Sequence, residues 1–258
     1  MHQEIELKLL VKAGHLPLLS GLLQQLGAQD QGVKVLENIY YDTPKLDLNQ
    51  VKAALRLRKT VQGWLQTLKT AGSNQGGLSY RGELEVAVPG PQLQPELLPL
   101  DLVPLAWQQQ LEPKFRTDFQ RHTWLLKLSS AQLNSTLAPQ VVTAAPAQKL
   151  ESQQHLIEIA ADVGWATSPI TSQRYPINEV ELELKQGSPT ALLYLASYLA
   201  PHLAFVPGQL SKAEVGWYLY LGQPLPQQAP ASLSSSQESI KELKKVLDSK
   251  GLLATTSS

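Results

Sequence analysis

Apolar and polar residues alternate along most of this chain, a pattern that predicts β-strands with one apolar and one polar face. In residues 4–9, Glu4, Glu6 and Lys8 share one face of the predicted strand, and the apolar residues between them share the other. The alternation predicts strands at about 3–11, 34–42, 51–60, 64–70, 78–88, 114–128, 155–163 and 177–186. Because the glycine-rich segment 71–77 is predicted to be a hairpin turn, we expect an antiparallel sheet.

Two apolar helices are predicted beside these strands, at about 16–26 and 189–200. Gly27 is expected to end the first, and Ser188 followed by Pro189 is expected to begin the second. Such helices are required because apolar strand rows left in water would forfeit about 25 cal/mol per Å². The chain is therefore expected to adopt an α+β fold in which helices cover the apolar side of the sheet.

The polar faces of the predicted strands are sorted by the sign of their charge. Arg56 and Arg58 share a face of one strand, whereas Glu179, Glu181 and Glu183 share a face of another. A solvated surface usually alternates the two signs, because like charges at neighbouring positions on one face repel. Further rows are formed by Thr67 with Lys69, by Arg81 with Glu83 and Glu85, by Glu158 with Asp162, and by Lys185, which extends the Glu179 row. We expect each row to face groups of opposite charge.

The two kinds of charged row suit two kinds of ligand. Carboxylates bind hard divalent cations such as Mg²⁺, and guanidinium and ammonium groups bind phosphate oxygens. A sheet closed into a barrel would bring both kinds of row around one lumen, since interior and exterior residues alternate along every barrel strand. The alternative at this point is a structural β-barrel whose charged rows face solvent.

Composition narrows the classes of partner and of chemistry. The chain has 258 residues with 22 basic and 22 acidic side chains, so no broad cationic surface predicts binding to nucleic acid or to a membrane. It has no cysteine, which excludes disulfides and thiolate chemistry, and its five histidines lack zinc-ligand spacing. No apolar leader follows Met1 and no apolar run reaches membrane-spanning length, so a cytoplasmic location is expected.

One main domain and a C-terminal appendage are predicted. Residues 1–222 hold all the predicted strands, and residues 129–154, rich in Ser, Gln, Ala, Thr and Pro, are expected to be a flexible insertion. Residues 223–258 are predicted to form a linker and a short amphipathic helix, with Ser235 and Glu238 as a capping box at its start. This helix is expected to dock on its own barrel or on a partner, and a plug over one mouth of the lumen is the sharper alternative.

A set of short motifs occurs in a fixed order over residues 1–222. They are Glu4-x-Glu6-x-Lys8, Tyr40-Tyr41-Asp42-Thr43-Pro44, Arg56-x-Arg58, Thr67-Leu68-Lys69, Arg81-x-Glu83-x-Glu85, Glu179-x-Glu181-x-Glu183 and Ser211-Lys212-Ala213. This ordered set resembles the CYTH, or triphosphate tunnel metalloenzyme, superfamily, and it is most similar to the bacterial inorganic triphosphatase branch. The first motif alone would be weak support, whereas the ordered set is specific.

The resemblance implies a closed eight-stranded antiparallel β-barrel, with helices packed outside, that binds a triphosphate and either Mg²⁺ or Mn²⁺. Its implied phosphate ligands are Lys8, Arg56, Arg58, Lys69, Arg81, Arg121 and Lys212. Its implied metal ligands are Glu4, Glu6, Glu181 and Glu183, with Glu83, Glu85, Glu158, Asp162 and Glu179 as supporting acids. The residues implied to act in catalysis are Glu4, Glu6, Lys8, Arg58 and Lys69.

The implied reaction is metal-dependent hydrolysis of inorganic triphosphate to pyrophosphate and phosphate. Hydrolysis of thiamine triphosphate and adenylyl cyclisation are alternatives on the same fold, and a non-catalytic triphosphate or polyphosphate sensor is an alternative of another class. The chain departs from the branch at Glu214-Val215, where an Arg is expected, which puts one implied phosphate contact in doubt and adds an acid. Too few residues follow Gly222 to form the helical domain that the branch often carries.

Overall fold

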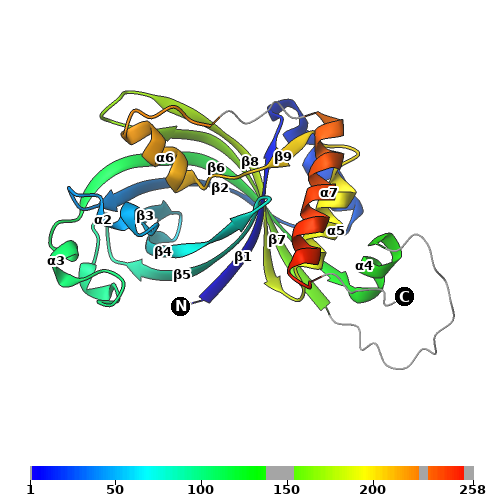
Figure 1. Ribbon diagram of the computed structural model, residues 1–258, viewed down its shortest axis with the longest axis horizontal. Helices are drawn as coiled ribbons and strands as arrows, with labels where there is room; N and C mark the ends of the chain where they lie inside the picture. Colours follow the sequence, from blue (N-terminus) through cyan, green and yellow to red (C-terminus); the bar gives the residue numbers. More distant parts are fainter. Residues whose placement is uncertain (1, 138–153, 227–231, 253–258) are drawn as a thin grey trace.

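The computed structural model of the chain describes residues 2–137, 154–226 and 232–252, which form a barrel with helices outside it (Figure 1). The barrel strands are β1 (His2–Val11), β2 (Gln29–Asp42), β3 (Ala54–Thr60), β4 (Gly63–Gln75), β5 (Leu78–Val88), β6 (Glu112–Ser129), β7 (Gln154–Thr167) and β8 (Arg174–Gln186). They are joined in the order β5-β4-β3-β2-β6-β7-β8-β1, and β1 pairs back with β5. Every one of these pairings is antiparallel, so the predicted closed eight-stranded barrel is confirmed.

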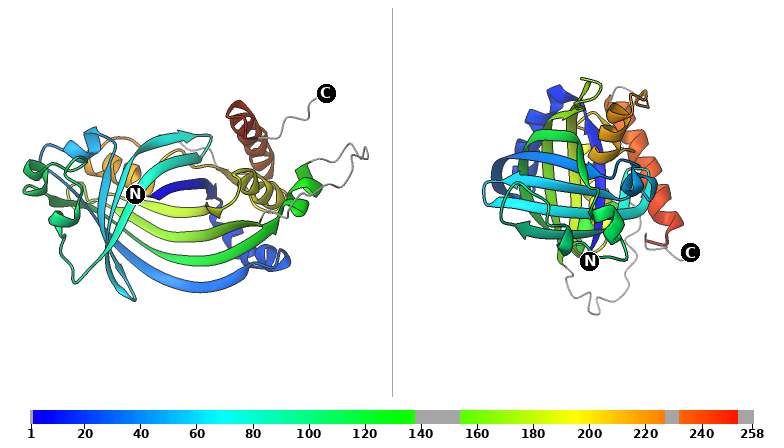
Figure 2. Two further views of the ribbon diagram at one scale, coloured as in Figure 1. Left: turned by 90° about the horizontal axis from the view of Figure 1, so that it is seen from below. Right: turned by 90° about the vertical axis from the view of Figure 1, so that its left-hand side faces the viewer.

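Helices cover the outside of the barrel toward both of its ends (Figures 1 and 2). The helices toward one end are α1 (Leu16–Gln25), α4 (Ser130–Leu137), α5 (Thr190–Leu199) and α7 (Leu233–Ser249). Those toward the other end are α2 (Asp47–Gln50), α3 (Leu105–Gln108) and α6 (Lys212–Tyr220). The short 3-10 helices are η1 (Ala13–His15) and η2 (Pro95–Leu97).

The apolar rows of β1 and β8 pack against the first group of helices, as their alternation requires. Leu7 and Leu9 of β1 and Leu182 of β8 are almost completely buried in one cluster with Leu192 and Leu195 of α5. Burial of a leucine side chain stabilises the folded state by about 1.5–3 kcal/mol. Because these rows face the helices, the charged rows of the same strands face the lumen.

The strand register places the charged rows side by side in the lumen. Glu6 pairs with Glu183 on β8, and Glu183 pairs with Glu158 on β7. Lys8 pairs with Glu181 in the same way. The side chain of Lys8 is only 7% exposed, which excludes the alternative in which these rows face solvent.

Several strands are longer than the alternation predicted; β7 continues to Thr167 and β8 begins at Arg174. β2 begins at Gln29 rather than near residue 34, and β4 continues to Gln75 through most of the predicted turn. The hairpin turn is reduced to Gly76 and Gly77, whose φ angles of 60° and 80° favour glycine because it has no Cβ.

The predicted insertion 129–154 contains helix α4, and its residues 138–153 lie outside the described part of the chain. The C-terminal helix α7 starts at Leu233, earlier than predicted. The Ser232 hydroxyl accepts a hydrogen bond from the backbone N–H of Ser235 and so caps the helix. The predicted capping box at Ser235 is therefore wrong.

Helix α7 packs against α5 and against β9 (Phe205–Pro207), a short strand paired with β1. Its buried side chains include Leu243, Val246 and Leu247. Linker residues 227–231, which precede it, lie outside the described part of the chain. Among the helices that the structure describes, none has the length and apolar character needed to cross a membrane.

Ser236 of α7 is completely buried, and its hydroxyl joins the helix to β9. The hydroxyl donates to the Leu203 carbonyl at 2.7 Å and accepts from the Phe205 N–H at 2.8 Å. Ser236→Ala is expected to lower the free energy of unfolding by about 1–3 kcal/mol, because it removes a partner from a buried N–H. Urea denaturation measures the loss, and Ser20→Ala on the exposed face of α1 is the control, with an expected change below about 0.5 kcal/mol. Equal stability of the two variants would contradict this role.

Candidate active site

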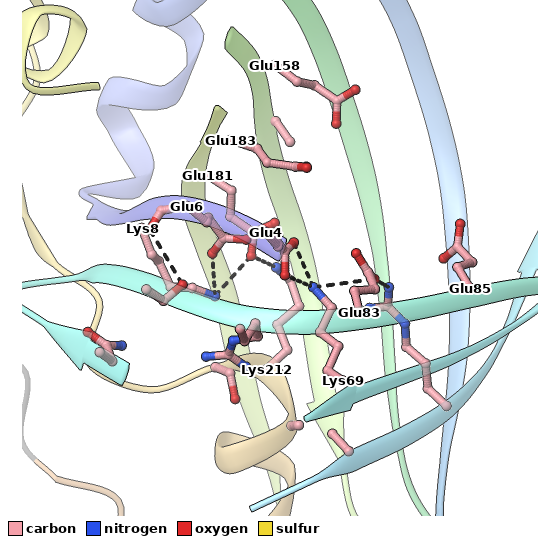
Figure 3. Close-up of a pocket in the computed structure, with 18 of the residues that line it drawn as sticks. Glu4, Glu6, Lys8, Lys69, Glu83, Glu85, Glu158, Glu181, Glu183 and Lys212 are labelled. Atoms are coloured by element: carbon pink, nitrogen blue, oxygen red, sulfur yellow. Dashed lines mark hydrogen bonds and ion pairs between the residues drawn. The ribbon is translucent and has the colours of Figure 1, made fainter. Parts of the chain in front are cut away.

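The barrel lumen holds a cavity of about 210 Å³, and most of the predicted site residues line it (Figure 3). The cations among them are Lys8, Arg56, Arg58, Lys69, Arg81, Arg121 and Lys212, and the acids are Glu4, Glu6, Glu83, Glu85, Glu158, Glu181 and Glu183. The other two predicted acids, Asp162 and Glu179, are buried in contact with Lys212. The fold therefore brings the predicted acids and cations together, while their roles in binding stay predictions.

Three acids in the cavity wall, which we call the neutralised acids, are surrounded by cations. They are Asp162, Glu179 and Glu181, and their carboxylate oxygens lie within 4.8 Å of one another. Lys212 Nζ lies 2.7 Å from Asp162 Oδ2 and 2.8 Å from Glu181 Oε1, and it also contacts Glu179. Lys8 Nζ lies 3.0 Å from Glu179 Oε1 and 3.0 Å from Glu181 Oε1. Two buried ammonium groups are thus shared among these carboxylates.

Arg121 completes this network from β6. Its Nε and a terminal nitrogen donate to the two carboxylate oxygens of Asp162 at 2.8 and 2.6 Å, and the terminal nitrogen also donates to Glu181. Burial alone would raise the pKa of Glu181, but Lys212, Lys8 and Arg121 hold it well below its usual value. Burial alone would lower the pKa of Lys8, but the carboxylates raise it. Glu181 and Lys8 therefore stay ionised at neutral pH.

The start of α6 fixes the position of Lys212. The Ser211 hydroxyl accepts from the Glu214 N–H at 3.2 Å, and the Glu214 carboxylate accepts from the Ser211 N–H at 2.7 Å. Glu214 therefore serves the helix start and does not line the cavity. Val215, which stands where the bacterial branch is expected to have Arg, is buried in a cluster with Ala166. The Ser-Lys-Ala motif is thus a helix cap that points one lysine into the lumen.

Arg56 and Arg58 of β3 form a basic part of the lumen that we call the arginine wall, and Arg81 of β5 lines the same cavity. Within the described part of the chain, no carboxylate lies at ion-pair distance from Arg58, whose Nε donates to Asn38 Oδ1 at 2.7 Å. Arg56 lies 3.8 Å from Glu83, and its buried Nε has no hydrogen-bond partner among the described residues. Burial and the like charges of neighbouring arginines lower the pKa of Arg58 to about 9. Buried guanidinium donors that lack an anion can bind phosphate oxygens.

A third group, which we call the acidic row, crosses three strands side by side. It consists of Glu6 on β1, Glu183 on β8 and Glu158 on β7. Burial, with repulsion from Glu181, raises the pKa of Glu6 to about 7. Burial also raises the pKa of Glu183, although Lys185 Nζ lies 2.7 Å from its carboxylate. Fewer cations contact this row than contact the neutralised acids.

Glu4 and Lys69 form an ion pair that links β1 to β4. Lys69 Nζ lies 2.8 and 2.7 Å from the two carboxylate oxygens of Glu4, and 3.6 Å from Glu83. Burial would raise the pKa of Glu4, but Lys69 lowers it. Glu85, the remaining predicted acid on β5, accepts a hydrogen bond from the Thr67 hydroxyl at 2.9 Å.

Tyr40 and Asn38 of β2 also belong to the lumen, and no role was predicted for them. They pair across the strands with Arg56 and Arg58. Tyr40 lines the cavity, and its ring stacks on Phe115 with 4.6 Å between the centroids. Burial would raise the pKa of Tyr40, but Arg56 and two neighbouring cations lower it. Asn38 and Tyr40 are two residues apart and so share a face of β2, a spacing that could have placed both in the lumen. The charge criterion did not identify them because both side chains are neutral.

The acidic row fits a divalent metal better than the neutralised acids do. Lys8, Lys212 and Arg121 together contact all of the neutralised acids and would repel a metal ion there. The acidic row is contacted by Lys185 and, at 4.0 Å, by Lys8. Its carboxylates offer the oxygen ligands that Mg²⁺ and Mn²⁺ take. Of the predicted metal ligands, those in this row therefore fit the role best.

Comparison with known proteins places the chain in a family. Inorganic triphosphatase from Haemophilus influenzae is 31% identical over 224 residues, which cover 85% of this chain and 55% of that protein, so the chain spans about half the length of this relative. HpAC1 from Hippeastrum, a candidate adenylyl cyclase with a dominant triphosphatase activity, has a similar fold, with a TM-score of 0.55 and 16% identity over 86% of this chain and 98% of that chain. The CYTH domain matches residues 2–204, most of the chain. The chain therefore belongs to the CYTH domain family.

Proposed function

We propose that the chain hydrolyses inorganic triphosphate to pyrophosphate and phosphate in the barrel lumen, with a divalent metal as cofactor. The observation that carries this proposal is the arginine wall, in which Arg58 is buried without a carboxylate partner among the described residues. A buried charge without a counter-ion is costly, and a phosphate oxygen would supply that counter-ion. The name of the Haemophilus influenzae relative supports the same reaction class. Cytoplasmic location and the lack of a nucleic-acid partner stay predictions from the sequence.

The arginine wall is expected to hold the phosphate chain, since guanidinium groups present forked donors that match phosphate oxygens. Arg58 and Arg81 can bind without breaking an ion pair within the described part of the chain. Lys69, which now pairs with Glu4, supplies a compact cation beside them.

The acidic row, with Glu4, is expected to hold Mg²⁺ or Mn²⁺. When bound, such an ion would screen the charge of the phosphates and lower the pKa of a bound water. The lumen needs this added charge, because Lys8, Lys212 and Arg121 are already neutralised by carboxylates. A triphosphate entering without metal would therefore meet few free cations.

The proposed reaction is an in-line displacement at a terminal phosphorus. The oxygen of a water molecule forms a bond to that phosphorus while the bond to the bridging oxygen breaks, which releases pyrophosphate. The water proton passes to a carboxylate of the acidic row. Catalysis of this kind depends on positioning and on neutralising charge, and the arginine wall would contribute to both.

Phosphate release from tripolyphosphate, thiamine triphosphate and ATP, each with Mg²⁺, Mn²⁺ or chelator, tests the proposal. We expect metal-dependent release that is fastest with tripolyphosphate. Faster turnover of thiamine triphosphate would overturn the substrate assignment, and cyclic AMP formed from ATP would indicate cyclisation. Binding of tripolyphosphate without turnover would favour a sensor, and neither binding nor turnover would reject the site.

Arg58→Gln is expected to weaken tripolyphosphate binding about 10- to 100-fold, because a charge-assisted hydrogen bond contributes about 1.5–3 kcal/mol. The variant should be no less stable than the original protein, since burial and neighbouring arginines disfavour the charge on Arg58. Isothermal titration and thermal denaturation measure the two effects. Arg116→Gln is the control, because Arg116 is 43% exposed and pairs with Glu37 and Asp118 outside the lumen. Unchanged affinity in Arg58→Gln would contradict the arginine wall as the phosphate site.

A further inference from the structure

Lys185 stands at the end of the acidic strand β8 and lines the lumen cavity. Its Nζ lies 2.7 Å from Glu183 Oε1 and 3.6 Å from Glu158 Oε1. Within the described part of the chain, no other cation lies at ion-pair distance from either of these carboxylates. Lys185 is therefore the cation that neutralises two of the three members of the acidic row.

The surroundings of Lys185 differ from those of Lys8 and Lys212. The side chains of Lys8 and Lys212 are each 7% exposed and are held by several carboxylates of the neutralised acids. The Lys185 side chain is 34% exposed, and its ion-pair partners among the described residues are Glu183 and Glu158. A long, partly solvated lysine can move its ammonium into water at low cost, because partly exposed ion pairs contribute little to stability.

An ammonium and a divalent metal cannot both use the same carboxylate oxygen at contact distance. Glu183 Oε1 lies 2.7 Å from the Lys185 ammonium, so a metal bound by Glu183 has to compete with that ammonium. The competing cation is tethered to the same strand two residues away, so its local concentration is always high. Metal binding is therefore opposed by a cation built into the chain.

We propose that Lys185 is a tethered counter-ion that occupies the acidic row in the metal-free protein and is displaced by the divalent cation, so that Lys185 sets the metal affinity of the lumen. The inference rests on the proposed function only in taking the acidic row as the metal site. It goes beyond that function by assigning a role to a side chain that binds neither the phosphate chain nor the metal.

Isothermal titration of Mn²⁺ into the full chain, without any substrate, tests this role. Lys185→Met keeps the length of the side chain and removes its charge, and it is expected to bind Mn²⁺ about tenfold more tightly than the original protein. Lys185→Gln should behave in the same way, and Lys185→Arg, which keeps the charge, should stay within about threefold. The control is Lys59→Met, which removes a surface cation that lies 3.0 Å from Glu37 and should leave Mn²⁺ affinity within about twofold.

Three results would overturn the inference. Unchanged or weaker Mn²⁺ binding in both Lys185→Met and Lys185→Gln would show that the ammonium does not compete. An equal gain in Mn²⁺ affinity in Lys59→Met would show that the net charge of the protein, and not the position of Lys185, causes the effect. Absence of Mn²⁺ binding in every form would remove the metal site itself. The proposed function is judged separately, because tighter Mn²⁺ binding in Lys185→Met supports the inference even when tripolyphosphate is not hydrolysed.

Discussion

Replacement of Lys212 by Met is expected to lower the free energy of unfolding by about 3–5 kcal/mol, the usual result of removing one partner from a buried ion cluster. Lys212 is 7% exposed and contacts Asp162, Glu179 and Glu181. Without Lys212, the three carboxylates keep only Lys8 and Arg121 as cations at ion-pair distance among the described residues. Three buried negative charges are then paired with two positive charges. Urea denaturation at pH 7 measures the effect.

Two comparisons make this expectation specific. Lys59→Met breaks an exposed pair and should cost less than about 1 kcal/mol. The loss in Lys212→Met should also shrink in acid. The folded-state pKa values of Asp162 and Glu181 are lowered, so their ion pairs stabilise the protein above pH 4 and lose that contribution as the pH falls. A loss below about 1 kcal/mol at pH 7, or one that is equal at pH 7 and in acid, would contradict the cluster.

The residues that share the lumen could be predicted because two simple rules act together, whereas the closed eight-stranded barrel was predicted from the resemblance to the CYTH superfamily. A spacing of two residues determines which side chains share a strand face, and sorting by sign indicates that the face is enclosed. Arg56 and Arg58 do share the lumen with Glu181 and Glu183. These rules did not predict the uncharged side chains of the lumen. The clearest case is Asn38, whose Oδ1 accepts a hydrogen bond from Arg58.

The pairing of cations with acids could not be predicted, because barrel closure decides it. Lys8 is 171 residues from Glu179 and 173 from Glu181, yet it contacts both. In the sequence, Glu179, Glu181 and Glu183 are three equivalent acids on one strand. In the structure, Glu179 and Glu181 contact Lys8 and Lys212, whereas Glu183 contacts Lys185. The distinction between the neutralised acids and the acidic row therefore exists only in the closed barrel.

Element ends depended on local contacts that alternation does not record. The hydroxyls of Ser232 and Ser235 are both suited to cap α7, and the structure uses Ser232. β4 continues through residues that were predicted to form a turn, because they pair with β5 as far as Gln75 and Leu78. These differences move boundaries by a few residues and leave the lumen unchanged.

Glu6→Gln is expected to remove a loss of stability with rising pH from the metal-free protein. The pKa of Glu6 is raised from 4.5 to about 7, so the folded state holds this proton more tightly than the unfolded chain does. The folded protein therefore loses stability as the pH rises from 4.5 to 7, by about 2–3 kcal/mol from this group. Gln at this position carries no such charge, so the variant should melt higher than the original protein at pH 8 and at nearly the same temperature at pH 4.5.

The same variant should lose most of its turnover, since Glu6 is a proposed metal ligand of the acidic row. We expect kcat for tripolyphosphate to fall at least about 100-fold, because even partners outside the ligand shell of a metal site are worth 10- to 100-fold. Stability and activity thus move in opposite directions, which a side chain with a purely structural role would not produce. Glu37→Gln, on the exposed face of β2, is the control and should leave both quantities unchanged. The variant could instead keep full turnover and the original pH profile of its melting temperature. That result would show that Glu6 neither binds metal nor destabilises the folded protein when it is ionised.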